Sequence, residues 1–379
     1  MAEETKKETI KKKSGNSKKQ STNEEKSQKS VKNEAKTTKK VEKNAKITKN
    51  ASKSSNHAIE SKSAKTTKRN QKSAVEKTET EKPVPSSPKH IKVLGFHDLE
   101  LNTYVYDNVK NPKAVVLIVH GMQEHILRYA PFAEFLQKNG YVVVMSDLRG
   151  HGHTMQTPEE YGKGEKDIFT ETLKDQLNLI EFAHDEFKLP LYIFGHSYGS
   201  MLTQFLVQLS PIPEKAVICG TTNGDSGIFK LGSLAVGMMS PFEIHDKRGG
   251  LAEKLCIKSF GKKFENGNWL SRDDKVFEAY LKDDLCGGSF PFSFYRSMIK
   301  NMRKANKGIG KIGNKKLFLI AGDKDPVGEN GKQVKKLYKT YLKNNINARM
   351  KLYPNARHEL LNEINKDEVY ADVLSFFDE

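Results

Sequence analysis

One serine in this chain lies in a setting that suits covalent catalysis. Ser197 is the centre of Gly195-His196-Ser197-Tyr198-Gly199, a G-x-S-x-G string. The string follows a short apolar run and precedes a helical pattern, which predicts a sharp strand-to-helix turn that raises the serine hydroxyl above a sheet. Glycines at both ends of the string remove the Cβ atoms that would collide in so tight a turn. We therefore predict that Ser197 is a nucleophile at a helix N-terminus, where negative charge is favoured.

A serine hydroxyl is a weak nucleophile and needs a base that is itself oriented by an acid. After a turn of this kind, the acid precedes the base along the chain. Asp325 lies just beyond the apolar run 317–321, and Asp323 is a rival in the same loop. Of the eleven histidines, only His358 follows both Ser197 and Asp325. We predict a catalytic triad of Ser197, Asp325 and His358, and we favour Asp325 over Asp323.

Acyl transfer through such a triad also requires hydrogen-bond donors for the oxyanion of the tetrahedral intermediate. The residue after the nucleophile supplies one backbone N–H, which here is that of Tyr198. A loop after an early strand supplies the other, and His120-Gly121-Met122 follows the apolar run 114–119. We predict the Met122 amide as the second donor and a packing role for His120.

These residues need a scaffold to bring them together. Uninterrupted apolar runs rich in Val and Ile are typical of strands covered on both faces, as in a parallel sheet. Such runs lie at 114–119, 141–145, 191–194, 216–219 and 317–321, with a weaker run at 348–353 and a predicted hairpin at 92–106. Apolar residues at helical spacing occur at 173–187, 200–209, 334–342 and 369–376. This alternation predicts an α/β fold with a doubly wound, mostly parallel sheet.

One stretch, from about Thr221 to Gly313, interrupts the alternation. It has no clear buried strand, and it contains the only tryptophan, Trp269. We predict an inserted helical cap here. Its apolar residues could line an acyl-chain pocket or equally form the core of the cap: Phe229, Leu231, Leu234, Met238, Met239 and Phe242.

The first 88 residues differ in composition from the rest. They carry 24 Lys and Arg against 11 Asp and Glu, a net charge of +13 out of +17 for the whole chain, and the first aromatic residue is Phe96. Too little apolar surface is present to offset the entropy of ordering a backbone, so we predict a disordered tail at 1–88 and a folded domain at 89–379. The tail is either a plain solvated spacer or a weak electrostatic tether to anionic lipid or nucleic acid.

Targeting signals are not evident in the sequence. No segment reaches the roughly 18 apolar residues that span a bilayer, and the charged N-terminus lacks the apolar stretch of a secretory signal. Three widely spaced cysteines, Cys219, Cys256 and Cys286, suit a reducing compartment and lack the paired spacing of a zinc site. We expect a cytoplasmic protein that is either free or peripheral at a membrane surface.

Several segments resemble, in order, the monoacylglycerol lipase and lysophospholipase family. Residues 120–125 with Arg128-Tyr129 look like its oxyanion loop, 147–152 like its second turn and 195–199 like its nucleophile turn. Residues 268–273 and 284–287 are similar to its cap, and 322–327 and 358–363 to its acid and base segments. The resemblance spans about residues 92–379 and omits the tail. It implies an α/β-hydrolase fold.

The resemblance also implies a substrate, a monoacylglycerol or a lysophospholipid, that is hydrolysed at a carboxylic ester. In that family Glu124 and Arg128 would lie near the polar head of the substrate, and a loop ion pair is the equal alternative. No metal or cofactor requirement is expected. Other hypotheses are a serine aminopeptidase, a general short-chain carboxylesterase and, more remotely, a tethered binding module with a vestigial site.

Overall fold

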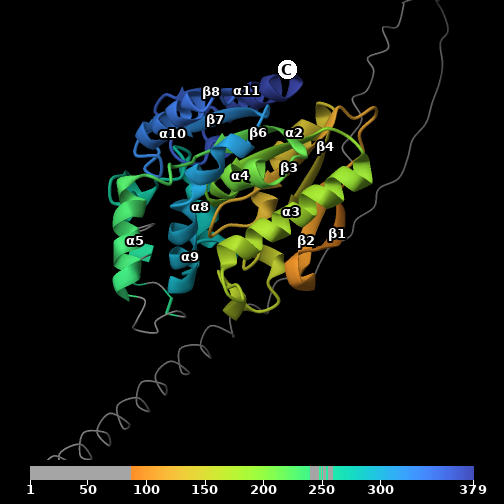
Figure 1. Cartoon of the computed structure of the whole chain (residues 1–379). Helices are drawn as coiled ribbons and strands as arrows, with labels where there is room; N and C mark the ends of the chain where they lie inside the picture. The colour runs from red at the N-terminus through yellow and green to blue at the C-terminus, as the bar shows by residue number, and fades with distance from the viewer. Residues whose placement is uncertain (1–86, 240–246, 249, 251–252, 255–258) are drawn as a thin grey trace, which may run out of the picture. The chain divides into compact units, whose positions relative to one another are not determined.

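An eight-stranded sheet forms the centre of the computed structural model, which describes residues 87–239, 247–248, 250, 253–254 and 259–379 (Figure 1). The strand order is β1-β2-β4-β3-β5-β6-β7-β8. β1 and β2 form an antiparallel hairpin, β2 is antiparallel to β4, and every other pairing is parallel. The strands are β1 (Lys89–Leu94), β2 (Glu100–Tyr106), β3 (Ala114–Val119), β4 (Tyr141–Ser146), β5 (Leu191–His196), β6 (Pro213–Cys219), β7 (Lys316–Gly322) and β8 (Ala348–Tyr353). The predicted mostly parallel sheet is confirmed.

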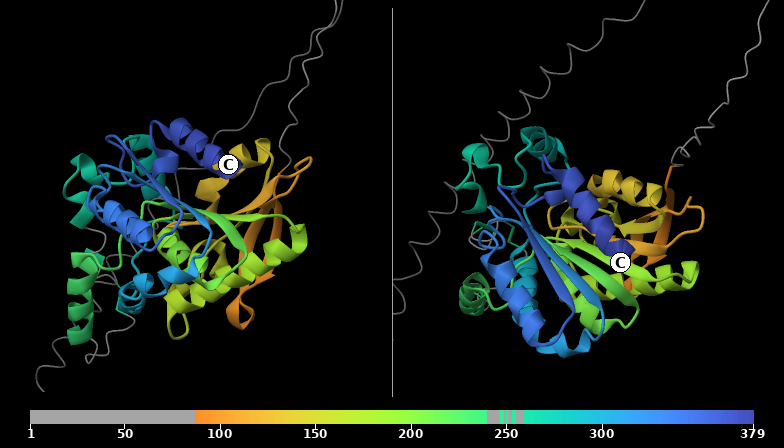
Figure 2. Two further views of the ribbon diagram at one scale, coloured as in Figure 1. Left: turned by 45° about the horizontal axis from the view of Figure 1, so that its top comes forward. Right: turned by 90° about the horizontal axis from the view of Figure 1, so that it is seen from above.

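Helices cover both faces of the sheet, so its central strands are apolar on both sides. Along β3, Val115, Leu117 and Val119 belong to one hydrophobic cluster, and the residues between them belong to the other. One face carries α3 (Ile168–Phe187), α4 (Tyr198–Leu209) and α10 (Lys332–Lys343), and the other carries α2 (Ala130–Lys138) and α11 (Lys366–Asp378). Figure 2 shows α11 and α3 on opposite sides of the sheet. The sequence patterns predicted four of these helices and missed the nine-residue α2.

Short 3₁₀ helices connect the larger elements. They are η1 (Phe96–Asp98), η2 (Ile126–Tyr129), η3 (Gly152–Thr154), η4 (Pro158–Glu160), η7 (Glu265–Gly267), η8 (Ala305–Lys311) and η9 (Leu360–Asn362). Two of them matter for the site, because η2 follows the predicted oxyanion loop and η9 follows His358.

Between β6 and β7 the chain leaves the sheet and forms the predicted helical cap. Its described helices are α5 (Gly227–Met239), α7 (Ser259–Gly261), α8 (Asp274–Lys282) and α9 (Phe292–Met302). Within the described part of this stretch the only β pairing is an isolated bridge between Arg248 and Pro291. The cap is attached to the sheet domain through α9, where Asn301 Nδ2 and Ser297 Oγ donate hydrogen bonds to Asp167 Oδ1 at 2.9 and 2.6 Å.

Some predictions fall outside the part of the chain that the structure describes. They are the tail, apart from residues 87 and 88, the side chains of Met238 and Met239, and Phe242. The boundary at residue 89 therefore stays a prediction. Among the described residues, no helix has the length and hydropathy needed to cross a bilayer.

Candidate active site

Ser197 lies in the tight turn between β5 and α4. Its backbone adopts φ 52° and ψ −116°, a conformation that non-glycine residues rarely take. A Cβ on Gly195 would lie 2.1 Å from Thr203 Oγ1, and one on Gly199 would lie 2.1 Å from the Val119 carbonyl oxygen. Only glycine fits at either position. The close approach at Gly199 brings the start of α4 onto the end of β3, where the predicted oxyanion loop begins.

His358 and Asp325 are brought together by the loops that follow β8 and β7. His358 Nδ1 lies 3.0 Å from Asp325 Oδ1, and the two residues are 2 % and 0 % exposed. The same carboxylate oxygen accepts a hydrogen bond from the Val327 amide at 2.9 Å, which orients the acid. Burial lowers the pKa of His358, but the charge of Asp325 and its hydrogen bond outweigh burial, so the net pKa is raised.

Asp323, the rival acid, has a different role. Its Oδ1 accepts a hydrogen bond from the Asn355 amide at 2.8 Å, and its side chain is 37 % exposed. Asp323 thus stabilises the turn after β8, and within the part of the chain that the structure describes it is Asp325 that pairs with His358.

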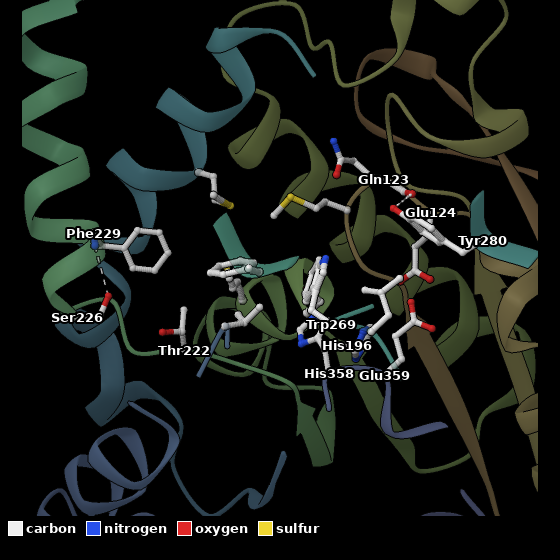
Figure 3. A pocket seen from close by; sticks show the side chains of 17 residues that line it. Gln123, Glu124, His196, Thr222, Ser226, Phe229, Trp269, Tyr280, His358 and Glu359 are labelled. Carbon is white, nitrogen blue, oxygen red and sulfur yellow. Dashed lines mark hydrogen bonds between the residues drawn. The ribbon is translucent and has the colours of Figure 1, made fainter. Parts of the chain in front are cut away.

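The surroundings of His358 and Ser197 form one pocket between the sheet domain and the cap (Figure 3). The Trp269 ring of the cap lies 5.0 Å from the His358 ring, and the His196 ring lies 4.7 Å from it on another side. A Cβ on Gly220 would lie 3.1 Å from His358 Cε1, so the backbone after β6 also packs against the imidazole. The base is thereby restricted in orientation and shielded from water.

The predicted oxyanion loop passes directly beside the nucleophile. A Cβ on Gly121 would lie 3.1 Å from the Ser197 Cβ, so the loop packs against the nucleophile at the residue before Met122. Tyr198 is the first residue of α4, so its N–H has no acceptor within the helix. The two predicted donors thus belong to the residue after Ser197 and to the loop packed against it, and their role in an oxyanion hole stays a prediction.

His120 packs beneath this loop, as expected. Its Nε2 accepts a hydrogen bond from the Leu148 amide at 2.9 Å, so the proton is on Nδ1, which donates to the Gly121 carbonyl at 2.7 Å. Burial lowers the pKa of His120 to about 3, so the ring is neutral. His151 is buried beside it, and burial likewise lowers its pKa to about 3. Both rings are neutral and contribute to packing beneath the loop.

Glu124 and Arg128 form a buried network with Glu359, the residue after His358. Arg128 Nη1 donates to Glu124 Oε2 at 2.5 Å, and its two terminal nitrogens donate to the Glu359 carboxylate at 2.8 and 2.7 Å. Glu124 Oε1 also accepts a hydrogen bond from the Gly121 amide at 2.7 Å. The predicted loop ion pair exists, and it connects the oxyanion loop to the loop that carries the base.

The two carboxylates that share Arg128 have different acidities. Burial raises the pKa of Glu124 despite the nearby guanidinium. For Glu359, burial is outweighed by the charge and hydrogen bonds of Arg128, which hold its pKa below the usual value. Glu124 and Glu359 are among the pocket-lining residues, whereas Arg128 lines a smaller neighbouring cavity that it shares with Glu359.

The pocket is otherwise mostly apolar. Its lining includes Met122, Met201, Phe229, Phe260, Trp269, Leu270, Met298 and Val327. The expectation that Leu231 and Leu234 could line it, or form the core of the cap, was wrong, because they face solvent on α5 and are 68 % and 61 % exposed. Phe229 of the same helix does line it. Sequence reasoning did not assign Trp269 and Tyr280 to the site, and the only signal was that the single tryptophan lies in the cap.

One cluster at the edge of the site contains types of side chain that bind metals. Ligand atoms of His125, Asp283 and Cys286 lie within 4.8 Å of one another. His125 Nε2 and Asp283 Oδ2 already pair at 2.8 Å, and burial raises the pKa of the Cys286 thiol, which favours the protonated form over the thiolate that metals bind. We assign no metal to this cluster.

Comparisons with known proteins agree with this architecture. A monoglyceride lipase homolog of Monkeypox virus is 27 % identical over 285 residues, which cover 72 % of this chain and 92 % of that protein. Phospholipase YtpA of Bacillus subtilis is 25 % identical, covering 71 % and 96 %. In fold, the chain is similar to the solved thermostable carboxyl esterase of Bacillus coagulans, with a TM-score of 0.71, 22 % identity and coverage of 77 % and 98 %. Residues 110–365 match the serine aminopeptidase S33 family, so this chain is a member of that family of α/β-hydrolases.

Proposed function

We propose that this protein is a serine carboxylester hydrolase that cleaves a small lipid ester through an acyl-enzyme on Ser197. The observation that carries the proposal is the convergence on one apolar pocket of Ser197 in its strained turn and the buried His358–Asp325 pair. An acid, a base and a nucleophile in this relation are the requirements for acyl transfer.

The reaction would proceed in two halves. In the first, Ser197 Oγ forms a bond to the ester carbon while its proton passes to the imidazole of His358. The amides of Met122 and Tyr198 stabilise the resulting oxyanion. As the intermediate collapses, the carbon–alkoxide bond breaks and the alcohol leaves with the proton from His358. In the second half, water gives a proton to His358 as its oxygen bonds to the acyl carbon. The bond between that carbon and Ser197 Oγ then breaks, Ser197 takes the proton back from His358, and the fatty acid leaves.

The pocket supports a substrate with an acyl chain and a small polar head. Phe229, Trp269 and Met298 of the cap provide an apolar surface beside the nucleophile, which suits an aliphatic chain. We also propose that Met238 and Met239 influence the preference for acyl-chain length. A monoacylglycerol or a lysophospholipid matches these features, and the relatives described above carry monoglyceride lipase and phospholipase names.

The family name raises aminopeptidase activity as a second candidate. Recognition of a free α-amine needs a carboxylate that is available to the ligand. The acidic residues that line the pocket are Glu124 and Glu359, and both already bind Arg128. A buried carboxylate that already pairs with a guanidinium would bind a substrate amine more weakly, so the ester hypothesis is favoured. A third candidate is a non-catalytic binding module. Loss of turnover in Ser197→Ala would argue against it.

The test combines covalent labelling with a substrate panel. Full-length protein should be labelled by a fluorophosphonate probe at Ser197 and should hydrolyse monoacylglycerols or lysophospholipids faster than aminoacyl amides. Ser197→Ala should lose labelling and nearly all turnover while it remains folded by circular dichroism. Full labelling of that variant would falsify the assignment of the nucleophile, and a preference for aminoacyl amides would select the aminopeptidase instead.

A further inference from the structure

A single residue, Gln123, connects the predicted oxyanion loop to the cap. It follows Met122 directly and is 4 % exposed. Its backbone has φ +59°, in the left-handed region that residues other than glycine seldom adopt. An isolated loop would not favour this conformation, so contacts from neighbouring segments must maintain it.

Most of those contacts come from one cap segment, residues 280–288. The Gln123 carbonyl oxygen accepts a hydrogen bond from the Gly287 amide at 2.9 Å and another from Tyr280 Oη at 3.0 Å. The Gln123 side chain donates from Nε2 to the Gly288 carbonyl at 2.6 Å. Two residues further on, His125 pairs with Asp283 at 2.8 Å. Figure 3 shows Gln123 and Tyr280 together at one end of the pocket.

The cap segment is itself fixed against the sheet domain. A Cβ on Gly288 would lie 2.6 Å from the Tyr161 ring, so the segment lies directly against that side chain. Arg248 donates hydrogen bonds to the carbonyls of both Tyr161 and Ser289. Because the segment is held in place, its hydrogen bonds can fix the position of Gln123.

The Met122 amide lies between two fixed points. On one side is Gly121, which belongs to the sheet domain and whose amide donates a hydrogen bond to Glu124 Oε1. On the other side, the cap fixes Gln123 through both its carbonyl and its side chain. The Met122 N–H shares a peptide group with the Gly121 carbonyl, which accepts a hydrogen bond from His120 Nδ1 at 2.7 Å. Its direction therefore depends on this bond as well as on how Glu124 and Gln123 are held on either side. An oxyanion donor stabilises the transition state only when it is aimed where the charge develops.

We propose that Gln123 is a positioning residue through which the cap segment 280–288 sets the geometry of the oxyanion hole. The proposal rests on the proposed serine hydrolase function and extends it, because it gives the cap a role in the chemical step besides that of covering the substrate. Gln123 does not touch the reacting atoms in this scheme. It acts through the Met122 amide.

The experiment compares three variants of the full chain with the wild type. Tyr280→Phe removes one oxygen that donates to the Gln123 carbonyl and retains the ring. Gln123→Glu keeps the size of the side chain but removes the donor to Gly288. Asn301→Ala is the matched control, because it removes a cap-to-domain hydrogen bond, the one to Asp167, far along the chain from the oxyanion loop. Melting curves by circular dichroism establish that each variant folds, and Tyr280→Phe is the least disruptive of the three.

Two measurements separate positioning from a general loss of structure. One is kcat and KM on a short soluble ester. The other is the affinity of a trifluoromethyl ketone, whose carbonyl carbon bonds to Ser197 and whose oxygen becomes the oxyanion. Loss of one positioning hydrogen bond should lower kcat and ketone affinity by roughly threefold to tenfold in Tyr280→Phe and Gln123→Glu, with little change in KM. Asn301→Ala should change neither quantity by more than about twofold, because Asn301 is buried on α9 and its hydrogen bonds go to Asp167 and Ser297, away from the oxyanion loop.

The outcomes distinguish this inference from the proposed function. If the wild type hydrolyses no ester, or Ser197→Ala keeps the activity, the proposed function fails. If turnover depends on Ser197 but Tyr280→Phe and Gln123→Glu behave like Asn301→Ala, only the positioning role of Gln123 is overturned. A rise in KM at unchanged kcat would also overturn it, because that result indicates a contact with bound substrate.

Discussion

Replacement of Asp325 by asparagine should nearly abolish turnover, because His358 is buried and Asp325 contributes most to stabilising its charge, with smaller contributions from Glu359 and Glu124. The Nδ1 to Oδ1 distance is 3.0 Å, and both side chains are almost wholly excluded from solvent. An asparagine of the same size would remove the negative charge and offer its amide to the imidazole, which favours the wrong tautomer.

The size of the effect follows from the charge that His358 carries in the transition state. Two unit charges about 4 Å apart at an effective dielectric constant of about 20 attract each other by about 4 kcal/mol. Since about 1.4 kcal/mol corresponds to a factor of ten in rate, the loss should be on the order of 10³-fold. The wrong tautomer of His358 should lower the rate further, to a total loss of about 10⁴-fold, which is the loss seen when the acid of a related triad is changed in this way.

The assay is the pH dependence of kcat/KM on a short soluble ester. His358 acts as a base only when neutral, and its pKa is raised by Asp325 against the effect of burial, so wild-type activity should fall as the pH drops through a value above about 6.5. In Asp325→Asn the plateau should drop and the acid limb should move to lower pH, because Asp325 no longer offsets the effect of burial, and the remaining contributions of Glu359 and Glu124 are smaller. The same raised pKa means that the pair stabilises the fold fully below about pH 6.5 and loses this contribution as the pH rises through the folded-state pKa.

The control is Asp323→Asn in the same loop. Its carboxylate accepts a hydrogen bond from the Asn355 amide and is partly exposed, so we expect a loss of less than about tenfold. The reasoning would be refuted if Asp323→Asn lost more activity than Asp325→Asn, or if Asp325→Asn kept the wild-type acid limb.

Four further predictions test other parts of the argument. Gly199→Ala should lower the melting temperature sharply, because its Cβ would lie 2.1 Å from a carbonyl oxygen. Gly310→Ala should not, since its Cβ would meet nothing within 4 Å, and equal melting temperatures of the two variants would contradict the close approach. Arg128→Met should cost roughly 3–5 kcal/mol in urea unfolding, since two buried carboxylates lose their partner, and a change below about 1 kcal/mol would contradict that view. Phe229→Ala should raise the preferred acyl-chain length by opening the pocket wall, and an unchanged chain-length profile would exclude this side chain from the acyl site. A chain that begins near Lys89 should hydrolyse a soluble ester at the full-length rate but adhere less to anionic vesicles or nucleic acid at low salt, and loss of turnover on truncation would contradict the separate roles.

Local patterns in the sequence predicted most of the scaffold. The apolar run 114–119 coincides with β3, and 348–353 coincides with β8. β3 is buried on both faces, so its apolar composition reflects its position directly, whereas β8 is a half-buried edge strand and gave the weaker pattern. The turn at Ser197 and the position of the acid after β7 could also be predicted from the sequence. A tight turn restricts which residues can occupy it, as Gly195 and Gly199 show. The short helix α2 was missed because nine residues give too little periodicity to stand out.

The sequence by itself determined the residue types that can carry out the chemistry, their order along the chain and the strands and turns that present them. It could not decide which side chains of the cap face the pocket. Leu231 and Phe229 are only two residues apart on α5, yet one is exposed and the other lines the site, because the packing of the helix against distant segments selects the buried face. Nor could spacing predict that Arg128 joins Glu124 to Glu359, 231 residues away, or that Tyr280 reaches the carbonyl of Gln123. Such contacts join segments that only the tertiary fold brings within hydrogen-bonding distance, and a local pattern carries no information about them.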